Sequence, residues 1–426
     1  MSETDEQRAY REERTEELVW ERARALGMSR KRFLEVLASG AGAAVALGLG
    51  GRPAVAQQAQ GHAPHFNQYA NWFVKPTPAE YFIDHGHAKE MRWEVMKGRG
   101  YTVANDIFYL QNHFPVPRID PKAYKLRVHG DAVEREVEFS LDELKKLPSV
   151  TLTRAVECGE NGRVFFAVQY KKQMDGAQWR LGGVGVAEWT GVPMRAVLER
   201  ARVKPGARDV MPVGLDGGQD FRNLSARPMP LDRAMADDTL LVYGMNGQDL
   251  PPDHGGPVRT LVSGWIGPAS IKWTGRVEVS SKVLVSIFNT EYGVMVGPDY
   301  PPQPPFPGVV CTWQNVKSAF ELPMNAVLPS GPQIISGRSW SGKSSIRKVD
   351  VSLDGGKMWK PARLREPNLE KAWVRWDVEW TAVPGNYAFR ARATDTLGQT
   401  QPDKGPPYNF HGYLYDGVVD HPVWVF

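Results

Sequence analysis

A run of prolines near residue 300 divides the chain into two parts with different sequence patterns. Residues 294–316 read VMVGPDYPPQPPFPGVVCTWQNV. Proline fixes the backbone angle φ and lacks the amide hydrogen that helix interiors and inner strands need. Such a segment is semi-rigid, so we expect it to connect two domains. Helical patterns precede this segment but do not follow it, and the two parts therefore need separate fold assignments.

The part before the proline run, residues 62–293, interleaves short strand and helix patterns. Residues 149–158 alternate β-branched side chains, as strands do. Residues 140–148 predict a short helix, because Ser140 and Glu143 have the spacing of a capping box. This interleaving predicts an α+β domain built on mixed sheets.

The part after the proline run, residues 317–426, shows strand patterns. In the stretch AWVRWDVEW every second side chain is apolar, namely Ala372, Val374, Trp376, Val378 and Trp380. Several such strands within about a hundred residues are typical of an immunoglobulin-like β-sandwich. The expected fold class is therefore an α+β domain followed by an all-β immunoglobulin-like domain.

Residues 1–56, a charged extension followed by an export signal, are expected to lie outside both domains. The basic stretch Ser-Arg-Lys-Arg-Phe-Leu (29–34) precedes a short apolar run that ends in Ala-Val-Ala, the pattern of a signal cleaved after Ala56. The run is too short and too rich in Gly and Ala to span a membrane comfortably, so the mature protein is expected not to cross one. The basic stretch resembles a twin-arginine (Tat) signal with Lys31 as the second basic residue. It predicts a periplasmic protein exported already folded, with a Sec signal or an uncleaved anchor as the alternatives.

The charge of the chain bears on its partners. It carries 52 basic and 48 acidic residues, for a formal net charge of +4, and the two kinds are well mixed along its length. A nucleic-acid binder would cluster its Lys and Arg residues on one face or along one stretch. The composition therefore argues against a nucleic-acid partner.

Only two cysteines occur in the 426 residues, and Cys158 lies in the polar, glycine-bearing stretch AVECGENGR. A thiolate acts as a nucleophile or as a metal ligand. No cysteine-protease signature surrounds Cys158, and no further Cys or His stands nearby at zinc-ligand spacing. In an oxidising compartment Cys158 and Cys311 can form a disulfide, although their sequence contexts differ. A single cysteine can also bind a metal when a cofactor supplies the remaining ligands.

Several segments, from about residue 75 to the C-terminus, resemble the sulfite oxidase family of molybdenum enzymes and occur in that family's order. ECGENGR resembles the family's Cys-Ala-Gly-Asn-x-Arg turn, in which the cysteine binds molybdenum. The family's next block resembles residues 179–201. The family's segment around the pterin resembles residues 240–280, and the start of its C-terminal sandwich resembles residues 336–359. The resemblance implies that Cys158 is the single protein ligand of molybdenum, which is carried by molybdopterin.

The same resemblance implies roles for further residues. Positions that bind the pterin cofactor in the family correspond to His113, Asp216, His254, Arg259, Ser270, Ile271 and Lys272. These residue types suit the task, because Arg and Lys bind phosphate while Asp and His bind the polar edges of a pterin. Positions that face the substrate correspond to Gln111, Arg163, Trp179, Tyr292 and Arg375, with Tyr300 as the alternative to Tyr292.

Two of these substrate positions, Arg375 and Gln111, are unusual in their place or residue type. Arg375 lies on the strand face opposite the apolar face, so its side chain points out of the sandwich core, and the resemblance implies that it reaches the substrate across the domain boundary. Gln111 departs from the family, which has an arginine before the Asn-His pair. That change removes one positive charge from the anion pocket, and it leaves the identity of the substrate open.

The resemblance implies oxidation of a small sulfur oxyanion, sulfite, to sulfate by oxygen-atom transfer. Electrons would pass singly to an external acceptor such as a c-type cytochrome, since the chain has no Cys-x-x-Cys-His motif and is expected to carry no haem. The C-terminal sandwich implies a homodimer. One alternative is the same cofactor acting on a sulfane sulfur or a sulfoxide. The other is a non-enzymatic secreted binding module, because immunoglobulin-like sandwiches often serve binding.

Overall fold

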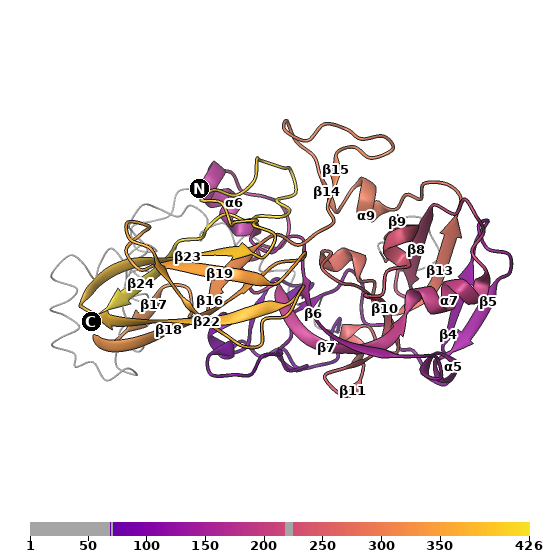
Figure 1. Cartoon of the computed structure of the whole chain (residues 1–426), viewed down its shortest axis with the longest axis horizontal. Helices are drawn as coiled ribbons and strands as arrows, with labels where there is room; N and C mark the ends of the chain where they lie inside the picture. The colour runs from indigo at the N-terminus through magenta and orange to yellow at the C-terminus, as the bar shows by residue number, and fades with distance from the viewer. Residues whose placement is uncertain (1–68, 70, 218–224) are drawn as a thin grey trace, which may run out of the picture.

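The computed structural model of the protein describes residues 69, 71–217 and 225–426 (Figure 1). The predicted export signal and its extension, residues 1–56, lie outside this part of the chain. Strands dominate the described residues, and the helices are few and short. None of the helices in these residues is long and apolar enough to cross a membrane.

Three sheets build the first part of the molecule. A small antiparallel sheet has the order β1-β2-β3, with strands β1 (Phe82–Asp84), β2 (Ala88–Met91) and β3 (Leu110–Gln111). The central antiparallel sheet has the order β11-β10-β7-β6, with β12 also paired to β10. Its strands are β6 (Val150–Glu157), β7 (Val184–Pro193), β10 (Thr239–Met245), β11 (Gln248–Asp249) and β12 (Arg259–Val262).

The third sheet is mixed, as the sequence predicts. It has the order β5-β4-β13-β8-β9, and β4 and β13 run parallel. Its strands are β4 (Lys125–His129), β5 (Val137–Ser140), β8 (Asp209–Gly214), β9 (Met229–Pro230) and β13 (Thr274–Ser280). It shares one apolar core with helices α5 and α7 and with part of the central sheet.

Short helices connect these strands. They are α5 (Leu141–Lys145), α6 (Arg163–Tyr170), α7 (Met194–Ala201), α8 (Leu231–Ala234) and α9 (Ile287–Thr290), together with the 3-10 helices η2 (Trp93–Met96), η3 (Pro252–His254) and η4 (Gly267–Ala269). The predicted capping box begins α5: Ser140 Oγ accepts a hydrogen bond from the backbone N–H of Glu143 at 3.2 Å, and the Glu143 carboxylate accepts one from the Ser140 N–H at 2.8 Å.

The proline run contains a small hairpin. Strands β14 (Val294–Met295) and β15 (Val309–Val310) pair antiparallel, and the loop between them stands out from the body of the molecule (Figure 1). The segment thus returns on itself before the chain enters the second part.

Two sheets build the second part. The first has the order β16-β18-β22-β21, with strands β16 (Lys317–Phe320), β18 (Gly331–Trp340), β21 (Arg363–Arg365) and β22 (Trp373–Ala382). The second has the order β17-β24-β23-β19-β20, with strands β17 (Ala326–Leu328), β19 (Ile346–Ser352), β20 (Lys360–Pro361), β23 (Gly385–Asp395) and β24 (His421–Val425). Side chains from both sheets share one apolar core, so this part is a β-sandwich.

The alternation predicted for β22 is largely confirmed. Val374, Trp376 and Val378 are buried in the core of the sandwich. Trp373, on the opposite face, is also fully buried, because it packs against the first part of the molecule and its Nε1 donates to the Tyr101 carbonyl at 2.8 Å. The end of this outer face that carries Trp373 therefore lies at the boundary with the first part.

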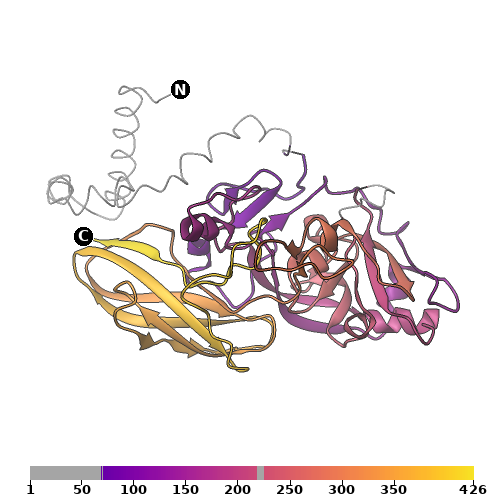
Figure 2. The same cartoon turned by 90° about the horizontal axis from the view of Figure 1, so that it is seen from above.

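The sandwich also sends a long segment back over the first part. After β23 the chain leaves the sandwich, crosses the middle of the molecule and returns as β24 (Figure 2). The carbonyl of His411, in this segment, accepts a hydrogen bond from Arg163 Nε at 2.9 Å. Residues separated by about half the chain are thereby brought together.

Candidate cofactor and substrate site

A cavity of about 410 Å³ lies where the two parts meet, a size typical of small-molecule sites. Its lining comes from the loops after β3 and β6, the segment from η3 to η4, helix α9 and the returning C-terminal segment. All but two of the predicted site residues line it: Gln111, His113, Cys158, Arg163, Asp216, His254, Arg259, Ser270, Ile271, Lys272 and Tyr292.

The turn that carries Cys158 follows β6 directly and leads into α6. The Cys158 N–H donates to the Gly183 carbonyl at 2.8 Å, and the Asn161 N–H donates to the Cys158 carbonyl at 3.0 Å. Gly162 ends the turn with φ of 101°, a left-handed conformation that glycine adopts without strain. The chain can therefore turn sharply from strand to helix while Cys158 faces the cavity.

The two cysteines do not form a disulfide. Both are free and buried, and burial raises the pKa of each thiol. Among the described residues, no three His, Cys, Asp or Glu side chains are arranged to hold a metal ion by themselves. A metal bound at Cys158 would therefore need other ligands from a cofactor, and its charge would favour the thiolate.

Two cations, Arg259 and Lys272, line the cavity on the segment that follows η3 and are called the inner cations below. Arg259 Nη1 and Nη2 donate to the carbonyls of His254 and Ser270 at 3.0 and 2.9 Å, and Lys272 Nζ donates to the Asp253 carbonyl at 2.9 Å and to Asn112 Oδ1. Burial lowers the pKa of Arg259 to about 10 and that of Lys272 to about 7. Within residues 71–217 and 225–426 neither side chain forms an ion pair with a carboxylate, so an anionic ligand would stabilise both.

The cavity histidines are neutral hydrogen-bonding groups. Burial lowers the pKa of His113 to about 4 and that of His254 well below its usual range. Lys75 was not predicted. Its Nζ lies 3.4 Å from His254 Nε2, and burial lowers the pKa of Lys75 to about 7. These histidines can donate and accept hydrogen bonds toward a polar ligand without adding charge.

Two oxygen atoms at the cavity have no hydrogen-bond partner in the described part of the protein. They are Asp216 Oδ1 and Gln111 Oε1, and both atoms are buried. Buried polar atoms are nearly always paired in folded proteins. Their position on the lining indicates a ligand with hydrogen-bond donors.

The positive charge of Arg163, which also lines the cavity, is balanced within the protein. Arg163 and Glu160, called the outer pair below, form an ion pair with 2.8 Å between Nη2 and Oε1. The other guanidinium nitrogens of Arg163 are also engaged, because Nε donates to the His411 carbonyl at 2.9 Å and Nη1 to the Ala177 carbonyl at 3.2 Å. Glu160 was not predicted, although the matching family position is glycine and the difference could have drawn attention to it.

Aromatic side chains complete the outer lining. Tyr292 is 42% exposed, and its ring lies 6.0 Å from the His411 ring and 6.3 Å from the Phe288 ring. Tyr300 does not line the cavity, since its hydroxyl donates to the Pro407 carbonyl at 3.0 Å. His411 and Tyr413 were not predicted, and no local motif marks them, because only the return of the C-terminal segment brings them to the site.

Trp179 and Arg375 are not part of the lining. Trp179 is fully buried behind the wall, with its ring edge-on to Tyr109, which does line the cavity.

Arg375 was predicted to reach the substrate, but its Nη2 donates to the Glu366 carbonyl at 2.9 Å on the sandwich. Its cross-strand neighbour Arg338 contacts the first part instead, through a 2.9 Å bond from Nη1 to the Tyr101 carbonyl. The residues that cross the boundary into the cavity come from the C-terminal segment.

Comparison with known proteins identifies both parts of the chain. Residues 113–287 match the family described as "Oxidoreductase molybdopterin binding domain", and residues 309–417 match the "Mo-co oxidoreductase dimerisation domain". The sulfite oxidase of Gallus gallus is 33% identical over 342 residues, covering 74% of this chain and 71% of that protein. The chain belongs to the sulfite oxidase family.

Further relatives show how far the likeness extends. The mitochondrial sulfite oxidase of Mus musculus is 34% identical over 342 residues, which are 74% of this chain and 60% of that protein. The chain thus spans about three fifths of the mouse enzyme's length. The solved structure titled sulfane dehydrogenase SoxCD from Paracoccus pantotrophus superposes with a TM-score of 0.69 at 26% identity, covering 84% of this chain and 88% of that one.

The residues of the cavity fit the cofactor of this family. Cys158 offers one thiol, the inner cations suit an anionic phosphate, and Asp216 has a free acceptor for the amino groups of a pterin. This donor set is the one that a molybdenum–molybdopterin cofactor needs from a protein.

Proposed function

We propose that the protein is a molybdenum-dependent oxidoreductase that oxidises a small sulfur compound in this cavity. The observation that carries the proposal is the presence of one cavity-lining thiol together with two cations that form no ion pair with a carboxylate of the described residues. When bound, the cofactor supplies oxygen-atom transfer to sulfur and takes up two electrons. Cys158 would hold the metal, and Arg259 and Lys272 would hold the cofactor phosphate.

The remaining lining residues would orient the two ligands. His254, Ser270 and Ile271 lie next to the inner cations and His113 lies nearby on the lining, where they would contact the pterin. Gln111 and Tyr292 would face the substrate and offer an amide and a hydroxyl as neutral hydrogen-bond donors. Trp179 supports the wall from behind through Tyr109.

Sulfite is the first substrate candidate, supported by the sulfite oxidases among the relatives. Its oxidation to sulfate consumes one water and releases two protons and two electrons. Because the chain contains no Cys-x-x-Cys-His motif, we propose that it carries no haem and that the electrons leave singly to a separate c-type cytochrome.

A sulfane sulfur bonded to a larger thiol is the second candidate, and the charge of the outer cavity favours it. Gln111 is neutral, Arg163 is paired with Glu160, and burial keeps the pKa of His113 low. The outer cavity therefore offers little net positive charge to a free dianion. The similar structure titled sulfane dehydrogenase points to the same class of substrate.

A loaded preparation tests the proposal directly. The full chain would be expressed in a host that makes molybdopterin, and molybdenum and pterin would be measured per protein. Reduction of cytochrome c would then be followed with sulfite, with glutathione persulfide and with a sulfoxide as the control. Turnover of sulfite supports the first candidate, and turnover of the persulfide alone supports the second. A protein purified without molybdenum or pterin would contradict both and favour a binding module.

We also propose that the protein acts in the periplasm as a homodimer of chains with a catalytic domain at 62–293 and an immunoglobulin-like domain at 317–426, joined by 294–316. The matched dimerisation family supports the dimer, and sedimentation of the loaded protein tests it. Replacing Arg30 and Lys31 with Gln tests export, since the Tat receptor reads paired basic residues. Cofactor-loaded precursor should accumulate in the cytoplasm, and unchanged periplasmic activity would contradict the Tat assignment.

A further inference from the structure

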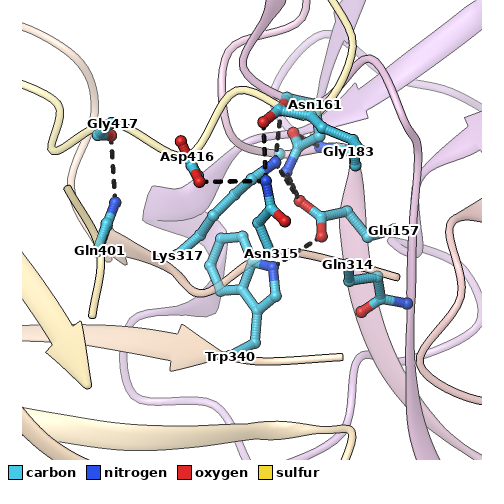
Figure 3. A network of polar contacts seen from close by, with 12 residues as sticks. Glu157, Asn161, Gly183, Gln314, Asn315, Lys317, Trp340, Gln401, Asp416 and Gly417 are labelled. Atoms are coloured by element: carbon cyan, nitrogen blue, oxygen red, sulfur yellow. Dashed lines mark hydrogen bonds and ion pairs between the residues drawn. The ribbon is translucent and has the colours of Figure 1, made fainter. Parts of the chain in front are cut away.

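A buried ion pair joins the strand that enters the cysteine turn to the first strand of the sandwich (Figure 3). Glu157, the last residue of β6 and the neighbour of Cys158, contacts Lys317, the first residue of β16, with 2.8 Å between Oε1 and Nζ. Both side chains are 2% exposed. The pair therefore connects the two parts of the molecule next to the predicted metal ligand.

Further hydrogen bonds fix this pair on all sides. Lys317 Nζ donates to the Asn161 carbonyl at 2.8 Å, and Trp340 Nε1 donates to Glu157 Oε2 at 3.0 Å. Asn161 Nδ2 donates to Glu157 Oε1 at 2.9 Å, and Asn161 Oδ1 accepts from the Gly183 N–H at 2.9 Å (Figure 3). Lys317 thus holds the turn at two points, one on each side of Cys158.

The returning C-terminal segment holds the same turn from another direction. The Leu414 N–H donates to the Gly159 carbonyl at 2.9 Å. Asn315, two residues before Lys317, fixes that segment through bonds from Nδ2 to the Leu414 carbonyl at 2.9 Å and to Asp416 Oδ2 at 3.2 Å. The backbone of the cysteine turn is therefore anchored to the second part of the protein at several atoms.

Stability alone is a poor explanation for such a pair. The free energy needed to remove two charges from water is about as large as the free energy gained from their attraction. Well-packed apolar side chains often stabilise a core equally well. Buried charges that are fully hydrogen-bonded do fix one arrangement of the groups they touch. Neither Glu157 nor Lys317 lines the cavity, so any effect on the site must act through the turn.

We propose that Lys317 is a positioning residue for Cys158. By fixing Glu157 and the Asn161 carbonyl, its ammonium group sets the path of the turn and so the position of Sγ relative to the bound cofactor. The sandwich then completes the cofactor site in addition to any role in dimer formation. This inference rests on the proposed function, in which Cys158 is the metal ligand.

The test removes both charges together, because Lys317→Met alone would leave a buried carboxylate unpaired. The double variant Glu157→Gln/Lys317→Met is compared with Glu321→Gln/Arg338→Met. The control removes another buried ion pair at the same boundary, with 2.7 Å between Arg338 Nε and Glu321 Oε1, and it does not touch the cysteine turn. Molybdenum and pterin per protein, the electron paramagnetic resonance spectrum of the half-reduced protein, and kcat and KM per bound molybdenum are measured.

We expect the Glu157/Lys317 variant to bind molybdenum about ten- to a hundredfold less tightly, as when outer partners of metal ligands are lost. Its spectrum should change and its kcat should fall while KM stays near the wild-type value. The control should fold with a similar loss of stability and keep the wild-type spectrum. Equal loading and identical spectra for all three proteins would overturn the positioning role.

Two further outcomes keep the inference separate from the proposed function. A wild-type protein without molybdenum would overturn the proposed function, and the inference with it. If the double variant does not fold, Lys317→Arg keeps the charge but moves the donor atoms, and we expect a folded protein with an altered spectrum. A folded Lys317→Arg protein with wild-type loading and spectrum would overturn the inference alone.

Discussion

The inner and outer ends of the cavity both contain cations, but the cations differ in whether a carboxylate pairs with them. At the inner end Arg259 and Lys272 donate to backbone carbonyls and to Asn112, and no carboxylate of the described chain pairs with them. At the outer end Arg163 is neutralised by Glu160 at 2.8 Å. An anionic ligand would stabilise the charged forms of unpaired buried cations, whereas a paired cation already has a partner.

This difference separates the proposed roles of the two ends of the cavity. The inner end suits a cofactor that carries its own negative charge, whatever the substrate. At the outer end Gln111 is neutral and the charge of Arg163 is balanced by Glu160, and we propose that the substrate is selected there.

The largest effect is expected at Cys158, the predicted metal ligand. Losing an outer partner of a metal ligand costs about ten- to a hundredfold in activity, so losing the ligand should cost at least about a hundredfold. Cys158→Ser should fold and show almost no turnover, as measured by sulfur-dependent cytochrome c reduction. Cys311→Ser is the control and should be nearly silent, since Cys311 is a free thiol outside the cavity lining. A Cys158→Ser protein with most of its activity would show that the metal has another ligand.

The next effect concerns the inner cations. Arg259→Gln should weaken retention of the pterin about ten- to a hundredfold, the effect of one lost charge-assisted hydrogen bond of about 1.5–3 kcal/mol. Pterin and molybdenum remaining after dialysis provide the measurement. Arg195→Gln, at an arginine that is 47% exposed on the surface, is the matched control and should retain both. Equal retention in the two variants would place the cofactor phosphate elsewhere.

A smaller effect is expected at the outer end. If sulfite is the substrate, Gln111→Arg should lower its KM about tenfold, which corresponds to about 1.4 kcal/mol. The turnover number should change less, because the new charge would stabilise the bound substrate and the transition state alike.

Glu160→Gln should also lower KM for sulfite, since it releases the charge of Arg163. Arg163→Gln should raise KM, by a larger factor than Gln111→Arg lowers it. Steady-state kinetics with sulfite and with a persulfide at two salt concentrations provide the measurement. Unchanged sulfite kinetics in Gln111→Arg, or loss of persulfide activity, would identify Gln111 as a specificity residue for a substrate other than sulfite.

The smallest effect lies at Asp416, in the segment that carries the outer residues. Burial raises the pKa of this carboxyl from 3.8 to about 6, against the attraction of Lys317. The stability associated with its protonated form is complete below pH 4 and is lost as the pH rises through about 6.

Asp416→Asn should therefore stabilise the protein above pH 6 by about 1–3 kcal/mol and have little effect near pH 4. Thermal unfolding between pH 4 and 8 gives the measurement. Asp403→Asn, at an exposed carboxylate, is the control and should change stability by no more than about 0.5 kcal/mol. A pH-independent difference for Asp416→Asn would mean that its carboxyl is not perturbed by burial.

The local sequence determined the elements that depend on neighbouring residues. The capping box of Ser140 and Glu143 begins a helix, the alternation in 372–380 forms β22, and the turn at Cys158 follows a strand as predicted. The order of motifs also identified the family, and most of the residues predicted for the site line the cavity. Short-range hydrogen bonds and side-chain periodicity suffice for such features.

Only the tertiary structure decided which residues cross between the two parts. Arg375 points out of the sandwich core, as the alternation predicts, yet it stays on the sandwich, while His411 and Tyr413 reach the cavity. The charge of Arg163 could be read from the sequence, but its hydrogen bond to the His411 carbonyl could not. The link from Lys317 to Glu157 spans 160 positions. Such contacts depend on how two independently patterned parts pack, and no periodicity within either part encodes that packing.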